Sequence, residues 1–111
     1  MVTVLPRCDE VWLVNLDPTM GSEMKKTRPC LVVSPDVMNQ RLRTVLVAPL
    51  TTAVRPYPTR ITARFQSKAG QIALDQIRAV DQVRLRKKLG RISARVAESV
   101  SATLVEMFQR V

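Results

Sequence analysis

The chain has 111 residues, of which 46% are hydrophobic and 24% charged, and its net charge is +9. This length suffices for one domain with one core, and the apolar content excludes a disordered chain. No apolar run approaches the roughly 18 residues of a membrane-spanning helix, so we expect no membrane association. A strong positive potential attracts polyanions. We therefore expect a single domain, residues 1–111, whose partners are acidic.

Short apolar runs separated by polar loops predict a mainly β fold. The predicted strands are residues 10–16, 29–35, 44–51 and 59–65, with shorter and less regular pieces at 71–77, 79–85 and 89–93. Pro49, near the end of the third run, indicates a bulge or an edge. The fourth run alternates in polarity, which places Arg60 on a solvent-exposed basic face. Residues 36–43 form either a turn or a short helical piece, and Trp12 is expected in the core.

The last segment, 94–111, is the one convincing helix, because its apolar side chains recur three or four residues apart. These side chains are Ala97, Val100, Leu104, Met107, Phe108 and Val111. Ser93 is the expected N-cap. Short strands followed by one amphipathic helix predict a small antiparallel sheet or barrel packed on that helix. The apolar stripe is expected to face the core, and a dimer surface is the alternative.

The N-terminal residues 1–8 lack the features of a signal peptide, which favours the cytoplasm. Cys8 and Cys30 form no CxxC pair and the chain has no His, so we expect two reduced thiols and no zinc site. A disulfide between them is the open alternative. Cys30 lies within an apolar run and is expected to be a small core residue.

Several common kinds of catalytic site are excluded by the sequence. Three glycines form no phosphate-binding GxxxxGK[ST] or GxGxxG loop, and without His no Ser–His or Cys–His pair can activate a nucleophile. One candidate reaction is not excluded, namely cleavage of RNA by its own 2′-hydroxyl, because there the substrate itself carries the nucleophile. The protein then has to orient the RNA and neutralise charge on the phosphate. An arginine fork fits two phosphate oxygens, and Thr hydroxyls can share them.

A basic stretch runs from Arg78 to Arg95 and contains seven Lys or Arg residues against the single acid Asp81. A charge run is usually a solvated face. The alternative is contact with nucleic acid or with an acidic polypeptide, which would relieve the repulsion within the run.

The segment DEVWLVNLDPTMGSEMKKTRPCLVVSPDVMN, followed by LVAPLTT and ALDQIRAVDQVRL, resembles the MazF/PemK-like toxin endoribonucleases of bacterial type II toxin-antitoxin systems. The resemblance covers nearly the whole chain and depends on the DPT-GSE, RP, TT and DQ-R-D motifs occurring in this order. It implies a small SH3-like antiparallel barrel with a C-terminal helix, and a homodimer in the bacterial cytoplasm. It also implies sequence-specific, metal-independent cleavage of single-stranded RNA to 2′,3′-cyclic phosphate and 5′-hydroxyl ends, with no cofactor, and a cognate acidic antitoxin.

By the same resemblance, the catalytic residues correspond to Arg28 and Thr51, and Glu23 matches the acid of the first loop. Some PemK-like relatives carry an arginine two positions before the aspartate of the DQ motif. Here that position is Ala73, while Asp75 is retained, which favours a mechanism carried by Arg28 and Thr51. Loops 17–27 and 52–58 are expected to line the RNA groove. The expected RNA-binding residues are Asp17, Thr19, Lys25, Lys26, Thr52, Tyr57, Arg60, Asp75 and Gln76, of which Tyr57 could stack on a base.

Each candidate also has a structural alternative. Arg28 could form a salt bridge with Glu23 or Asp17, Thr51 could hydrogen-bond a turn, and Glu23 could brace its loop. Asp75 could hold the backbone of the next strand. A gyrase poison like CcdB is an alternative function on the same fold, but such proteins end in Trp-Gly-Ile and this chain ends in Phe-Gln-Arg-Val. A passive RNA-binding module or an SH3-like adaptor would need more than 4% aromatic residues.

Overall fold

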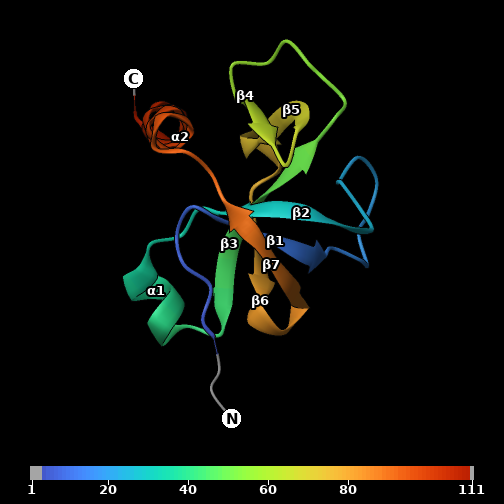
Figure 1. Cartoon of the computed structure of the whole chain (residues 1–111), viewed down its shortest axis with the longest axis vertical. Coiled ribbons are helices and arrows are strands. Elements are labelled where there is room, and N and C mark those ends of the chain that lie inside the picture. Colours follow the sequence, from blue (N-terminus) through green and yellow to red (C-terminus); the bar gives the residue numbers. More distant parts are fainter. Residues whose placement is uncertain (1–3, 111) are drawn as a thin grey trace.

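The structure is a computed structural model that describes residues 4–110, and it shows a curled antiparallel sheet beside a C-terminal helix (Figure 1). The elements of the first half are β1 (Glu10–Asn15), β2 (Thr27–Val32), α1 (Asp36–Arg41) and β3 (Thr44–Thr51). Those of the second half are β4 (Arg60–Phe65), β5 (Lys68–Ala73), the 3-10 turn η1 (Leu74–Gln76), β6 (Arg78–Asp81), the 3-10 turn η2 (Gln82–Arg84), β7 (Leu85–Arg91) and α2 (Ala94–Phe108). This arrangement confirms the predicted small antiparallel barrel or sheet with a terminal helix.

Strand β3 is the centre of the sheet, whose order is β4-β5-β3-β2-β1-β7, with β6 also paired to β3. Along one side, β3 pairs with β6 over residues 44–47 and then with β5 at Leu50 and Thr51. The sheet curls because its central strand changes partner. The sequence suggested a bulge or an edge at Pro49. In the structure Pro49 pairs with Cys30 of β2 on one side and lies between the β6 and β5 pairings on the other, where it has no strand partner that would need its missing N–H.

Two apolar clusters fill the two faces of the curled sheet. The inner core consists of Trp12, Val14, Leu16, Cys30, Val32, Val45, Val47 and Val80. The helix-side core consists of Val11, Leu31, Ala48, Ile72, Leu74, Ile92 and Val100. Strand β1 contributes to both clusters, which explains why residues 10–16 are apolar without alternation. Burial of Trp12 and Cys30 confirms their predicted core positions.

Helix α2 begins at its predicted N-cap, since Ser93 Oγ accepts a hydrogen bond from the Val96 N–H (3.3 Å). Val100 is buried, and Ala97, Leu104 and Met107 pack against the helix-side core, as the predicted stripe requires. Phe108 does not: its side chain is 71% exposed, because Met107 takes the inward position of the last turn. The helix ends at Phe108, and Val111 lies outside the described residues. Within residues 4–110 no helix is long and apolar enough to cross a bilayer.

Several strand boundaries differ from the predicted ones because tertiary pairing extends strands into polar sequence. Strand β2 begins at Thr27, two residues before the apolar run, and pairs with β1 as far as Asn15. Strand β5 begins at Lys68, because the hairpin with β4 turns in only two residues, Gln66 and Ser67. Both turn residues have positive φ, as a tight hairpin requires. The uncertain segment 36–43 contains helix α1.

Candidate active site

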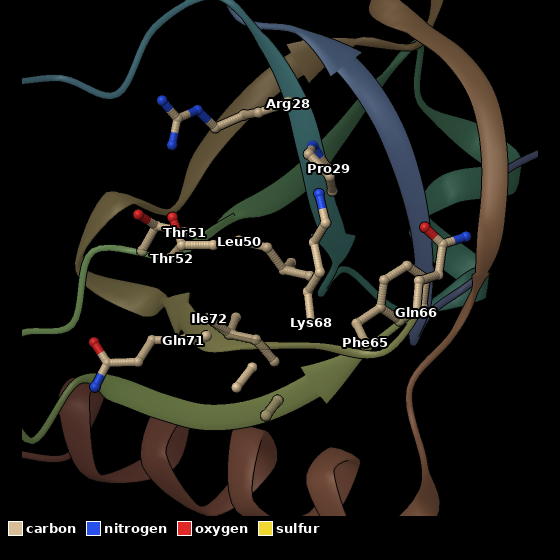
Figure 2. A pocket seen from close by; sticks show the side chains of 13 residues that line it. Arg28, Pro29, Leu50, Thr51, Thr52, Phe65, Gln66, Lys68, Gln71 and Ile72 are labelled. Carbon is tan, nitrogen blue, oxygen red and sulfur yellow. The ribbon is translucent and has the colours of Figure 1, made fainter.

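Arg28 and Thr51 line the same open pocket of about 430 Å³ at the end of β2 and β3 (Figure 2). Strands β2 and β3 pair from Val32–Val47 to Cys30–Pro49, and Arg28 and Thr51 lie two residues beyond this last pair, one on each strand. The polar lining residues are Arg28, Thr51, Thr52, Gln66, Lys68 and Gln71, and the apolar ones include Leu50, Ala63, Phe65 and Ile72. The sheet therefore brings the two side chains that were predicted to be catalytic into one pocket, whose remaining lining is partly apolar.

Among residues 4–110 no carboxylate pairs with the guanidinium of Arg28. Its Nε donates to the backbone carbonyl of Lys25 (3.2 Å), and its Nη1 contacts the sulfur of Met24 (3.7 Å). The ion pairs among residues 4–110 join Arg7 to Asp36, Arg60 to Asp75 and Lys88 to Glu10. The salt-bridge alternative for Arg28, with Glu23 or Asp17, is thus not what the structure shows. Its positive charge is held by the first loop and is not neutralised by a carboxylate.

Thr51 is positioned by its neighbours on β5. A β-carbon added to Gly70 would lie 2.5 Å from the Thr51 carbonyl oxygen, so only glycine permits this close approach. The Thr51 hydroxyl oxygen accepts a hydrogen bond from the Ala53 N–H (3.1 Å), which is the turn role considered as an alternative. The hydroxyl proton is not used by that bond, so Thr51 can still donate to a phosphate oxygen.

Gln71 holds the second loop to the pocket wall, a role that sequence reasoning missed. Its side chain is buried, accepts a hydrogen bond from the Arg55 N–H (2.9 Å) and donates one to the Arg55 carbonyl (3.1 Å). The side-chain amide thus bonds both backbone groups of Arg55, as a paired residue of a neighbouring strand would. Lys68 was missed as well and adds a second cation to the pocket (Figure 2). A polar residue next to the apolar run Ile72–Leu74 was the available signal for Gln71, and Lys68 had none.

The predicted residues of the first loop mostly brace it. Asp17 accepts from the Lys26 N–H (2.9 Å), Glu23 from the Met20 N–H (3.0 Å), and Gln76 of η1 from the Met24 N–H (3.3 Å). The bracing alternative for Glu23 is therefore present in the structure. Lys25 and Lys26 are exposed, Thr19 is half-buried, and Thr52 is exposed at the pocket rim.

Glu23, Asp75 and Gln76 line a second, smaller pocket of about 260 Å³, together with Met24, Pro49, Ile77 and Arg78. Two candidate acids thus line a different pocket from Arg28 and Thr51. Pro49 of the second pocket directly precedes Leu50 and Thr51, which line the first.

Arg60 and Asp75 form a bidentate ion pair. Arg60 Nε and Nη2 donate to the two carboxylate oxygens of Asp75 (2.7 and 3.1 Å), and Thr59 also donates to Asp75 (3.1 Å). The Arg60 side chain is only 6% exposed, so the strand alternation that predicted it on the solvent face is wrong at this residue. Its fork is occupied by Asp75 and is not offered to a phosphate in this structure.

This ion pair also fills the position noted at Ala73. Arg60 faces Ala73 across the β4–β5 register, so a guanidinium reaches Asp75 from the neighbouring strand. Hydrogen bonding from Arg60 lowers the pKa of Asp75 and raises that of Arg60. Asp75 therefore remains a carboxylate at neutral pH and is a weak proton acceptor.

The two cysteines lack the reactivity of nucleophiles. Both are free thiols, so the disulfide alternative is not found. Burial raises the pKa of Cys30 to about 12, and burial together with Asp9 raises that of Cys8 to about 11. Neither forms a thiolate at neutral pH. Residues 4–110 contain no cluster of three His, Cys, Asp or Glu side chains that could hold a metal ion.

A curled antiparallel half-barrel with a C-terminal helix is the fold of solved MazF toxins. The MazF structure from Deinococcus radiodurans superimposes with a TM-score of 0.83 and 25% identity, covering 95% of this chain and 97% of that one. A MazE–MazF complex from the same organism gives a TM-score of 0.79 at 22% identity, covering 98% of this chain and all of that one. These likenesses define the class: a small toxin of the MazF fold.

The sequence comparisons give the family. The profile of the PemK-like, MazF-like toxins of type II toxin-antitoxin systems matches residues 7–108, and the chain belongs to this family. Endoribonuclease PemK of Escherichia coli is 32% identical and covers 86% of this chain and 76% of its own length. Endoribonuclease MazF9 of Mycobacterium tuberculosis is 33% identical, with 79% and 83% coverage. Relatives named as endoribonucleases support the nuclease prediction and not the gyrase-poison alternative.

Proposed function

We propose that this protein is an endoribonuclease toxin that cleaves single-stranded RNA at specific sequences in the bacterial cytoplasm. The observation that carries the proposal is that Arg28, which pairs with no carboxylate of the described chain, lines one open pocket with Thr51. A phosphodiester supplies the anion that this guanidinium lacks. The names of the relatives, endoribonucleases PemK and MazF, support the same substrate class.

In the proposed reaction the RNA 2′-oxygen attacks the adjacent phosphorus. A P–O2′ bond forms and the P–O5′ bond breaks; the 2′-hydroxyl loses its proton and the leaving 5′-oxygen gains one. The products are a 2′,3′-cyclic phosphate and a 5′-hydroxyl. Arg28 binds the non-bridging oxygens with its planar fork, and Thr51 donates its hydroxyl to one of them. No metal or cofactor takes part in this proposal.

Cleavage of end-labelled single-stranded RNA in EDTA tests the assignment. The wild type should give discrete cuts, and Arg28→Ala should lower the rate by about 10²- to 10³-fold, the usual loss on removing one donor to the transition-state charge. Arg28→Lys should rescue little, because an ammonium lacks the fork.

The matched control is Arg43→Ala, which removes an exposed cation next to the opposite end of β3. It should cut at close to the wild-type rate. Equal rates for Arg28→Ala and wild type, with folding intact by circular dichroism, would remove Arg28 from the mechanism.

We further propose two protein partners. The net charge of +9 suits an acidic antitoxin segment that covers the positive pocket, and solved relatives include a MazE–MazF complex and a mycobacterial endoribonuclease with its cognate antitoxin. A second copy of the chain is the other partner. Val105 and Phe108 on the outer face of α2 are 64% and 71% exposed, and a homodimer would cover such a face.

A further inference from the structure

Tyr57 of the second loop lies against Arg60 at the start of β4, and Arg60 is paired with Asp75 of η1. The guanidinium of Arg60 is bound in plane by the Asp75 carboxylate, and its central carbon lies 5.2 Å from the centre of the Tyr57 ring. One face of the Tyr57 ring is thus directed at a buried cation. The residue is nevertheless 49% exposed, so much of the ring remains open to solvent.

The backbone that carries Tyr57 is held at both ends. The Arg60 N–H donates to the Tyr57 carbonyl (3.0 Å), which closes the turn into β4. Upstream, Gln71 pairs with both backbone groups of Arg55. Tyr57 also stands between Pro56 and Pro58, whose rings restrict the chain. An exposed aromatic ring on a loop with so little freedom loses little entropy when a ligand stacks on it.

The loop starts at the candidate active site. Thr52 and Gln71 line the pocket that contains Arg28, and the loop continues from Thr52 to Tyr57. Arg60 itself has one unused donor: its Nη1 is buried and has no hydrogen-bond partner among the described residues.

We propose that Tyr57 is a stacking platform for one base of the bound RNA strand, and that Arg60 is the positioning residue that holds the platform in place. This inference rests on the proposed function, because it takes single-stranded RNA as the ligand. Every base has a π-face, so stacking adds affinity and fixes the path of the strand without reading its sequence. By this proposal the Arg60–Asp75 pair positions the RNA and does not transfer protons.

The test uses an RNA oligonucleotide that spans a mapped cut and carries 2′-deoxyribose at the scissile position, so that it binds without being cleaved. The fluorescent base 2-aminopurine replaces each nucleotide in turn, since stacking on an aromatic ring quenches it. Wild-type protein should quench one position selectively. Tyr57→Phe should retain this quenching, and Tyr57→Ala should abolish it and weaken binding by about 5- to 100-fold.

Two further variants separate positioning from other roles. Arg60→Lys keeps the positive charge but loses the planar guanidinium that holds the Tyr57 ring in place. It should therefore reduce quenching at the same position even though Tyr57 is present. Arg28→Ala should lose cleavage and bind RNA more weakly, but at saturating protein concentration it should still quench the same position. If Tyr57→Ala binds and quenches as the wild type does, the platform is wrong while the nuclease proposal stands. If wild type neither cuts nor binds RNA, both fall.

Discussion

Gly70 determines where Thr51 lies, because any β-carbon at this position would overlap the Thr51 carbonyl at 2.5 Å. The atom in the way belongs to the backbone, so relief requires movement of a strand and not of a flexible side chain. We expect Gly70→Ala to lower stability by about 1–3 kcal/mol. Cleavage should fall further, by up to about 100-fold, because a small displacement of a positioned group is costly to catalysis.

Single-turnover cleavage rates and urea unfolding measure these two effects. Val45→Ala is the control, because it removes buried side-chain volume at the opposite end of β3 without touching Thr51. The control should lose stability and keep its rate at temperatures where it is folded. If Gly70→Ala behaves like the control, Thr51 does not depend on the close approach.

At the scale of elements, a buried carboxylate joins β7 to β1. Glu10 has a side chain only 3% exposed; it accepts from Lys88 Nζ (2.8 Å), the Trp12 indole N–H (3.1 Å) and the Arg7 N–H (2.8 Å). Burial alone would raise the pKa of Glu10, but these bonds outweigh it, so the pKa lies below its ordinary value of 4.5. The native state therefore favours the charged form, and protonation weakens this junction.

A depressed pKa fixes the direction of the pH dependence. The stabilisation by Glu10 is fully present above its unfolded-state pKa and is lost as pH falls through the lower folded-state value. Glu10→Gln should cost about 1–3 kcal/mol at pH 7, and its deficit against wild type should shrink below pH 4.5. Urea midpoints across a pH series measure this. Exposed Glu106→Gln on α2 is the control, and a deficit that does not change with pH would contradict the argument.

Local patterns predicted the elements well where burial or a hydrogen bond near in sequence decides them, as for residues 44–51 and the N-cap at Ser93. Local patterns failed where a contact between residues distant in sequence determines the direction of a side chain. Arg60 is directed inward because Asp75, fifteen residues later, binds its fork, and no alternation rule contains that information. Gln71 was missed for the same reason, since its partner Arg55 lies on a loop. The assignment of Arg28 and Thr51 to one site came from family resemblance, and the pairing of β2 with β3, whose last pair lies two residues from each of them, supplies its physical basis.

At the scale of the whole molecule, the charge of +9 predicts salt-dependent binding. Each phosphate neutralised releases counterions, so affinity for a non-cleavable single-stranded RNA should fall by about tenfold or more between 50 and 200 mM salt if three phosphates are contacted. Fluorescence anisotropy at several salt concentrations measures the slope. Polyglutamate, a probe for acidic polypeptides, should compete at low salt and lose its effect at high salt. Affinity that is indifferent to salt would contradict a charge-based interface.

Strand β7 forms one end of the sheet, and its exposed residues include Arg86, Lys87, Lys88 and Arg91. An open strand edge is a template on which another chain can add a strand and begin aggregation. Two copies that met edge to edge here would bring like charges together and repel. We therefore expect the basic stretch to oppose polymerisation of the protein through this edge of its sheet.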